Sequence, residues 1–191
     1  MVSLEMLSSL DGLLWLQAGE PVGTLLRQHQ TSVSRNQRKC AKAFRLTIEK
    51  ERGRWRIQGD TTLLNLERQV HQRARLDGKG RLRLEACRWM DHLHDACIPK
   101  GWLAGSSRLN EPMRSLELLH DRIIDALLLP LENDFDHAPW INTFHLSSKL
   151  SPADGDIALL MRPEVAAHPA SRELTHMLEA CLKTVSMQDQ L

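Results

Sequence analysis

The sequence predicts an α+β protein made of two unlike parts. In residues 4–76, apolar residues recur at helical spacing, except for two short alternating runs on either side of a glycine turn. From residue 81 onward, short apolar runs alternate with helical stretches, which is typical of a small α/β layer with parallel strands. Residues 77–80, with two glycines in four positions, form the clearest linker between the two patterns.

The charge distribution also differs between the two parts. The 191 residues carry a net charge of +1, and 42% are hydrophobic and 26% charged, as in an ordinary globular protein with one or two small domains. Residues 1–80 hold 14 Lys and Arg against 8 Asp and Glu, whereas the remaining residues hold 11 against 16. A basic N-terminal part joined to an acidic C-terminal part suggests a polyanion-binding module with a different attachment.

Targeting and cysteine patterns favour a cytoplasmic protein. No apolar run approaches the roughly 20 residues of a membrane span, and no basic segment followed by an apolar core begins the sequence. The four cysteines, at positions 40, 87, 97 and 181, lack a paired spacing. We therefore expect reduced thiols rather than a disulfide framework.

Two short helices are expected to precede a basic third helix. Leucines recur with an i, i+3, i+4 rhythm over Leu4–Gln17, and Ala18 and Gly19 are expected to end this helix. Pro21 suits the first turn of a second helix, expected over Pro21–His29. The second helix and the basic helix, separated by a tight turn near Gln30 and Thr31, form a pair of short helices of which the second is basic, and this pair indicates a helix-turn-helix arrangement.

The basic segment Gln30–Arg45 has the composition of a helix that enters a DNA major groove. Hydroxyls that can cap its first turn come from Thr31, Ser32 and Ser34. One face is a predicted buried stripe of Val33, Gln37, Cys40, Ala41 and Phe44. The remaining surface carries five cations and no carboxylate: Arg35, Arg38, Lys39, Lys42 and Arg45. Short donors reach base edges and long cations reach phosphates or guanine, although a solvated basic helix without a partner has the same composition.

A basic hairpin and a long helix follow. The runs Leu46–Lys50 and Trp55–Ile57 alternate around Arg52 and Gly53, which predicts a β-hairpin with a positive tip. A basic hairpin in this position is typical of a wing that contacts the DNA backbone or an adjacent minor groove. The next helix, capped by Asp60 or Thr61, is expected to end near Leu76.

This long helix has a narrow apolar seam that suits a partner helix. The seam consists of Leu63, Leu66, Val70 and Ala74, with Leu64 beside it. The outer positions are expected to hold Glu67, Arg68, Gln72, Arg73 and Arg75. Packing of the seam on its own domain is the alternative.

The second part is expected to form a small parallel sheet with helices. Strands are expected at residues 82–86, 101–106, 123–129, 140–146 and 157–162, and helices at 87–97, 111–121 and 171–185. The continuous apolar run at 123–129 is typical of a strand covered on both faces.

The order of these elements resembles the LysR-type transcriptional regulators. The segment Thr31-Ser32-Val33-Ser34-Arg35 occupies the place of the family's recognition-helix motif, and residues 115–129 and 161–169 resemble parts of its effector domain. The resemblance implies a winged helix-turn-helix, a dimerising linker helix and one lobe of a periplasmic-binding-protein-like effector domain. The family's effector domain has two lobes, but residues 131–139 are too few to hold a second one. The resemblance is therefore to a divergent member with a shortened effector domain, which argues against a small-molecule effector bound between lobes.

Catalytic and metal sites are not expected. Cys87, His92, His94 and Cys97 are close in sequence, but one helix cannot converge four zinc ligands, so a core face is the preferred interpretation. No nucleophile elbow, phosphate-binding glycine loop or HExxH motif is present, so we predict no enzyme activity, no cofactor and no metal. The acidic residues Asp121, Asp125, Asp134 and Asp136 are expected to be solvated.

We predict a transcriptional regulator that binds a two-fold-related operator in double-stranded DNA as a homodimer or higher homo-oligomer. The expected domains are residues 1–59 (DNA-binding), 60–77 (dimerisation) and 81–191 (effector-like). The expected DNA-binding residues are Thr31, Ser32, Ser34, Arg35, Arg38, Lys39, Lys42, Arg52 and Arg54, and the expected dimerisation residues are Leu63, Leu66 and Val70.

Two other hypotheses remain at this point. The first is a protein-interaction module without specific DNA binding, which would act through heterodimerisation or another protein. The second is a small-molecule site around Ser106, Ser107 and Arg108, after the second strand, where α/β proteins tend to bind ligands.

Overall fold

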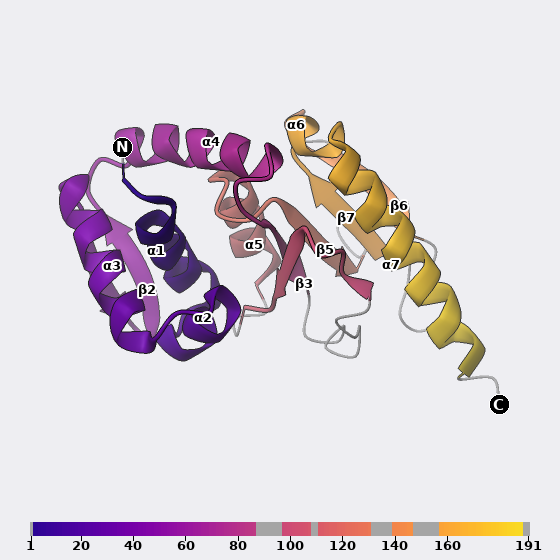
Figure 1. Cartoon of the computed structure of the whole chain (residues 1–191), viewed down its shortest axis with the longest axis horizontal. Helices are drawn as coiled ribbons and strands as arrows, with labels where there is room; N and C mark the ends of the chain where they lie inside the picture. The colour runs from indigo at the N-terminus through magenta and orange to yellow at the C-terminus, as the bar shows by residue number, and fades with distance from the viewer. Residues whose placement is uncertain (1, 87–96, 108–110, 131–138, 147–156, 189–191) are drawn as a thin grey trace.

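The chain combines helices with two β-sheets in a computed structural model that describes residues 2–86, 97–107, 111–130, 139–146 and 157–188. Three helices and a two-stranded hairpin lie at one end of the molecule, and a five-stranded sheet lies toward the other (Figure 1). Helix α4 runs between these two regions. The expected mixture of α and β structure is confirmed.

The elements occur in the expected order, but the second helix begins at Gly19 and ends at Leu26 instead of at His29, because Arg27 takes the left-handed conformation. The helices in the described ranges are α1 (Leu4–Leu16), α2 (Gly19–Leu26), α3 (Gln30–Ala43), α4 (Thr62–Leu76), α5 (Pro112–His120), α6 (Pro163–Ala166) and α7 (Pro169–Gln188). The strands are β1 (Thr47–Glu51), β2 (Arg54–Gln58), β3 (Leu82–Ala86), β4 (Trp102–Gly105), β5 (Ala126–Pro130), β6 (Asn142–Leu146) and β7 (Ile157–Met161). The helix expected at residues 87–97 lies almost entirely outside the described residues.

The break between α1 and α2 falls at Gln17 instead of at Ala18 and Gly19. Gln17 adopts the left-handed conformation, with φ of 61°, and its backbone N–H bonds to the carbonyl of Leu13. Gly19 already begins α2. The buried Gln17 amide makes several further hydrogen bonds, which offset the cost of the left-handed conformation for a residue with a Cβ.

The five-stranded sheet is mixed, so the expectation of a parallel sheet is wrong. The strand order is β4-β3-β5-β7-β6, in which β3 pairs parallel with β4 and β5. Strand β7 pairs antiparallel with both β5 and β6. The periodicity of an apolar strand does not encode the direction of its neighbour, because a strand buried on both faces has the same composition in either case.

The two faces of the sheet are buried against different helices. In β5, Leu127 and Leu129 pack into a core shared with α1, α3 and α5. Ala126 and Leu128 face the opposite core, which includes Leu174 and Leu178 of α7. The second part of the apolar run, residues 126–129, therefore lies in a strand covered on both sides, as predicted, whereas residues 123–125 precede the strand. The N-terminal helices share one core with the sheet.

Helix α4 buries three of the five polar residues that were expected on its outer positions, whereas Arg73 is exposed as expected. Arg68, Gln72 and Arg75 are only 2%, 2% and 6% exposed, although all three were expected on the outer face. Arg68 pairs with Asp11 of α1 at 3.0 Å, and Arg75 pairs with Asp125 at 2.8 Å. Both aspartates are fully buried, so the expectation that Asp125 is solvated is wrong as well. Paired burial is the usual condition for charges inside a protein.

Arg83 connects the two halves of this buried network. Its backbone N–H donates to Asp125 at 2.9 Å, and its guanidinium pairs with Asp11 at 3.3 Å. Burial lowers the pKa of Arg83 to about 10, so it stays cationic at neutral pH. Helices α1 and α4 and strand β3 are therefore joined by one set of charged hydrogen bonds.

Cys97 and Cys181 form a disulfide, which corrects the expectation of reduced thiols. The two residues are 84 positions apart in sequence, so no local spacing signals the pairing. Cys40 is a free, buried thiol whose pKa burial raises to about 12. Cys87, His92 and His94 lie outside the described residues. In the part of the chain that the structure describes, no helix is long and apolar enough to span a membrane.

Glu85 of β3 is a buried carboxylate with a raised pKa. It is 4% exposed and accepts hydrogen bonds from the indole N–H of Trp15 and from the backbone N–H of Ser107, the latter at 2.9 Å. Burial, the largest influence, raises the pKa of Glu85 from 4.5 to about 7. The folded state therefore holds this proton more tightly than the unfolded state.

Because the pKa of Glu85 is raised from 4.5 to about 7, the free energy of unfolding of the protein should fall as the pH rises through the window between these two values. Below this window both states are protonated, and within it only the unfolded state releases the proton. Relative to a Glu85→Gln variant, the wild type should lose about 2 kcal/mol of unfolding free energy between pH 5 and pH 8. Denaturant titrations of both proteins at the two pH values test this, and a constant difference between them would show that Glu85 titrates normally.

Candidate nucleic-acid interface

Helix α3 begins at Gln30 and is capped by His29, and not by its own hydroxyls. The His29 Nδ1 atom accepts a hydrogen bond from the Thr31 backbone N–H at 3.3 Å and lies 2.8 Å from the Thr31 hydroxyl. The expectation that Thr31, Ser32 or Ser34 caps the helix is therefore wrong, because His29 is the N-cap residue. This leaves the three side chains along the first turn of the helix.

The predicted buried stripe of α3 is confirmed. Val33, Gln37, Cys40 and Ala41 are all less than 6% exposed, and the three apolar residues among them share a core with leucines of α1. Phe44, which follows the helix, is half-buried against the same core. The orientation of α3 is thus fixed by apolar burial, and its other face is turned away from the protein.

The outward face of α3 carries the cations named from the sequence. Thr31, Arg35, Arg38, Lys39 and Lys42 are exposed, whereas Ser32 and Ser34 are half-buried. No ion pair between described residues involves any of these four cations. In Figure 1, α3 lies at the end of the molecule remote from α7. This surface therefore has a positive charge that no carboxylate among the described residues pairs with.

The hairpin next to α3 has the predicted turn. Arg52 and Gly53 have φ values of 49° and 83°, and Glu51 pairs directly with Arg54. Two successive left-handed residues form the tight turn whose twist matches that of an antiparallel hairpin. The Arg52 side chain is exposed at the tip. The turn therefore projects one cation beyond the sheet.

Gln17 attaches the hairpin to helix α1. Its side-chain carbonyl accepts a hydrogen bond from the Trp55 backbone N–H at 2.6 Å, and its amide N–H donates to the Leu14 carbonyl at 2.6 Å. Lys50 lies 5.9 Å from the centre of the Trp55 ring, a cation–π contact across the hairpin. Sequence periodicity gives no signal for Gln17, because its role depends on a partner 38 positions away.

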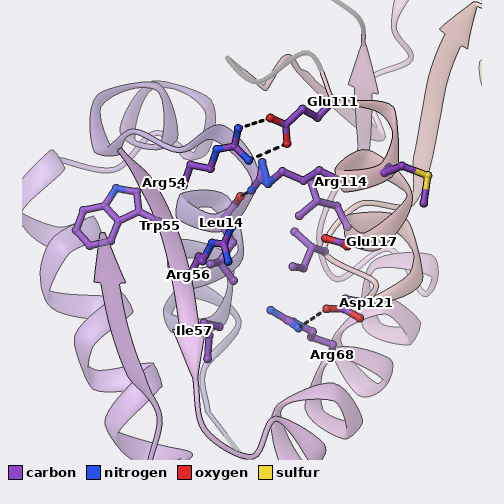
Figure 2. A pocket seen from close by; sticks show the side chains of 13 residues that line it. Leu14, Arg54, Trp55, Arg56, Ile57, Arg68, Glu111, Arg114, Glu117 and Asp121 are labelled. Atoms are coloured by element: carbon purple, nitrogen blue, oxygen red, sulfur yellow. Dashed lines mark hydrogen bonds and ion pairs between the residues drawn. The ribbon is translucent and has the colours of Figure 1, made fainter. Parts of the chain in front are cut away.

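Arg54 occupies a different position from the other named cations. Both terminal nitrogens of its guanidinium donate to the two carboxylate oxygens of Glu111, just before α5, one of them at 2.9 Å. This bidentate pair directs Arg54 toward the sheet domain instead of toward the α3 surface (Figure 2). The structure thus places eight of the nine named residues on α3 or the hairpin tip and turns Arg54 away from them.

The apolar seam of α4 is exposed along much of its length. Leu63, Leu66 and Val70 are 65%, 52% and 50% exposed, whereas Leu64 is fully buried. Ala74, the fourth seam residue, is half-buried. Three apolar side chains at helical spacing on a solvent-facing surface are available to another surface.

The structure gives little support to the other two candidate sites, the metal site and the small-molecule site after β4. Within the described ranges, no group of three or more His, Cys, Asp or Glu side chains is arranged to hold a metal ion. After β4, the Ser107 backbone N–H donates to Glu85. The Ser106 hydroxyl oxygen is buried and has no hydrogen-bond partner among the described residues. Arg108 lies outside the described residues.

Comparisons with known proteins found solved structures of similar arrangement at low identity. No family model matches the sequence, and no curated protein matches it. The oxidised form of OxyR from Corynebacterium glutamicum is 10% identical, with 97% of this chain and 94% of that chain covered and a TM-score of 0.41. Full-length OxyR from Pseudomonas aeruginosa is 13% identical over 76% of this chain and 55% of that one, with a TM-score of 0.41.

A third similar structure is CbnR, described as a LysR family transcriptional regulator. It is 13% identical, with 76% of this chain and 56% of that chain covered and a TM-score of 0.33. The description of CbnR thus names the family that the sequence resembles.

Proposed function

We propose that the chain is a DNA-binding transcriptional regulator that binds a two-fold-related operator as a dimer. In this proposal α1–α3 and the β1–β2 hairpin form a winged helix-turn-helix domain within residues 1–59. Residues 60–77 form the dimerisation helix, and residues 81–191 form the effector-like domain. The observation that carries the proposal is the exposed cationic face of α3, whose charge no described carboxylate pairs with.

The proposed DNA surface divides its residues between two roles. Thr31, Ser32, Ser34, Arg35 and Arg38 would meet base edges or flanking phosphates, because hydroxyls and guanidinium groups can bond to both. Lys39, Lys42 and Arg52 would contact phosphate. We leave Arg54 out of the DNA surface, because its guanidinium is paired with Glu111.

The proposed dimer places two such surfaces on one DNA molecule. Leu63, Leu66 and Val70 would pack against the same residues of a second copy, in a contact that is symmetric by construction. A dimer of this kind binds half-sites whose spacing is set by the helical turn of DNA.

Arg35→Ala and Lys42→Ala are expected to weaken DNA binding in different ways. If Arg35 contacts a base in a bidentate manner, its loss should cost about 1–3 kcal/mol on the preferred sequence and relax the preference at one position. Lys42→Ala should weaken binding to all sequences and reduce the salt dependence, because one phosphate contact is lost. Fluorescence anisotropy with preferred and random duplexes, over a series of salt concentrations, measures both effects.

Matched controls come from helix α7. Arg172 and Lys183 are exposed cations of the same two types on the helix most remote from α3. Arg172→Ala and Lys183→Ala should leave both affinities unchanged. If Arg35→Ala weakened binding to preferred and random DNA equally, the base-reading role of Arg35 would be refuted.

The alternative is a protein-interaction module, and the pairing of Arg54 with Glu111 is the observation that favours it. Because Glu111 neutralises the charge of Arg54, the hairpin has one cation fewer that could bind DNA phosphate. In that case the α4 seam would bind a different protein. Anisotropy with a pool of genomic DNA fragments would then show no binding at low salt, where phosphate contacts are strongest.

A further inference from the structure

Arg54 lies next to the tip of the hairpin but is held by the sheet domain. It begins strand β2, and its backbone lies opposite that of Glu51, beside the turn at Arg52 and Gly53. Its guanidinium forms a bidentate ion pair with Glu111, the residue that precedes α5. Figure 2 shows the two side chains meeting at the edge of a cleft of about 510 Å³ between β2 and α5. A cation beside the hairpin tip is therefore paired within its own chain.

The ion pair between Arg54 and Glu111 is accessible to a competing anion. The two side chains are 36% and 40% exposed, so water and salt screen their attraction. A phosphate group of DNA can form the same bidentate hydrogen bonds with a guanidinium group as a carboxylate does. A DNA phosphate can therefore compete with Glu111 for Arg54.

Glu111 is the one ion-pair partner of Arg54 among the described residues. On the hairpin itself, Glu51 lies opposite Arg54 but pairs with Arg56 instead, at 3.8 Å. The charge of Arg54 thus depends on a residue of the sheet domain for its neutralisation. Loss of the Glu111 carboxylate leaves Arg54 without an anion in the described part of the chain.

Arg114 adds a second reason why Glu111 is needed to hold Arg54. Its guanidinium donates to the Leu14 carbonyl at the end of α1, and its side chain lines the same cleft. Burial lowers the pKa of Arg114, the carboxylate of Glu111 raises it, and the charge of Arg54 lowers it. The two guanidinium groups are therefore close enough to repel each other, and Glu111 offsets this repulsion. Without the carboxylate, Arg54 is repelled from α5.

We propose that the ion pair between Arg54 and Glu111 is an autoinhibitory contact that withholds a DNA-binding cation of the hairpin. In the closed state, Glu111 holds Arg54 at the sheet domain. In the open state, Arg54 joins Arg52 at the hairpin tip and contacts a DNA phosphate. This inference rests on the proposed function, because it assigns a form of regulation to the proposed DNA surface.

The autoinhibitory contact links the position of α5 to the affinity for DNA. Arg54 belongs to the hairpin and Glu111 to the start of α5, so any displacement that separates these elements opens the contact. The open state forms one phosphate contact more than the closed state. A change within the sheet domain therefore alters DNA binding without touching α3.

Glu111→Gln tests the contact, because glutamine keeps the size of the side chain and removes its charge. Fluorescence anisotropy measures binding of the full chain to a labelled random-sequence duplex, which suffices because phosphate contacts carry no sequence information. The variant should bind about threefold or more tightly than the wild type at low salt. The slope of log affinity against log salt concentration should steepen by about 0.9, as one phosphate contact is added.

Two further variants identify the cause of this gain. In an Arg54→Gln background, Glu111→Gln should give no gain, because the released side chain no longer carries a charge. Glu117→Gln is the matched control for the loss of one negative charge. Glu117 is an exposed carboxylate of α5 that lines the same cleft and forms no ion pair among the described residues. This control variant should leave the affinity unchanged.

The autoinhibitory contact is refuted if Glu111→Gln binds no more tightly than the wild type. It is also refuted if the gain persists in the Arg54→Gln background, or if Glu117→Gln gives the same gain. A wild type that binds the duplex in any of these cases retains the proposed DNA-binding function. If neither the wild type nor Glu111→Gln binds the duplex at low salt, both proposals fail.

Discussion

Replacing Asp125 with Asn is expected to lower the free energy of unfolding by about 3–5 kcal/mol, as when one member of a buried ion pair is removed. Asp125 is fully buried and accepts four hydrogen bonds of 2.8–2.9 Å, from Gln72, from two nitrogens of Arg75 and from the Arg83 backbone. Without the carboxylate, the Arg75 charge stays buried without an anion, and the Asn amide group directs its own donors at other donors. The loss should therefore exceed that of an ordinary hydrogen bond.

Chemical denaturation of wild type and variant at one pH measures this effect. Asp77→Asn is the matched control, because Asp77 also pairs with an arginine of α4, Arg73 at 3.1 Å, but at the surface. An exposed pair contributes at most about 1 kcal/mol. Equal losses in the two variants would contradict the role assigned to the buried network.

Replacing Leu66 with Glu is expected to weaken self-association by about 100-fold or more. In a two-fold contact the substitution occurs twice, so two carboxylates enter the apolar seam and two leucine contacts are lost. Because Leu66 is 52% exposed in the single chain, the fold of the protomer should be retained. Sedimentation equilibrium measures association, and circular dichroism monitors the fold.

Met113→Glu is the control for this experiment. Met113 is 66% exposed on α5, so the same apolar-to-acidic change is made outside the α4 seam. It should leave association unchanged. A wild-type chain that stays monomeric at high concentration, or a Leu66→Glu variant that associates as the wild type does, would refute the dimer contact.

Local features of the fold were predictable from sequence, because their causes are local. The leucine rhythm of α1, the stripe that begins at Val33 and the turn at Arg52 and Gly53 depend on residues within a few positions of each other. The exposed seam at Leu63, Leu66 and Val70 was also correctly identified as an apolar surface.

Features set by distant partners were not predictable in the same way. Arg68 and Arg75 look like solvated residues until they meet Asp11 and Asp125, which are 57 and 50 positions away. The pairing of Arg54 with Glu111 spans 57 positions and removes one named residue from the proposed DNA surface. The apolar pattern indicates that a strand is buried, but it contains no information on which charge faces it or which strand lies beside it.

Selection of bound sequences from a random double-stranded DNA library, with the full wild-type chain, tests the central claim most directly. If the chain binds DNA as a dimer, we expect enrichment of a motif with two inverted half-sites, whose centres lie about 10 base pairs or a multiple of this apart. Failure to enrich any motif, while the protein remains folded and dimeric, would contradict the account.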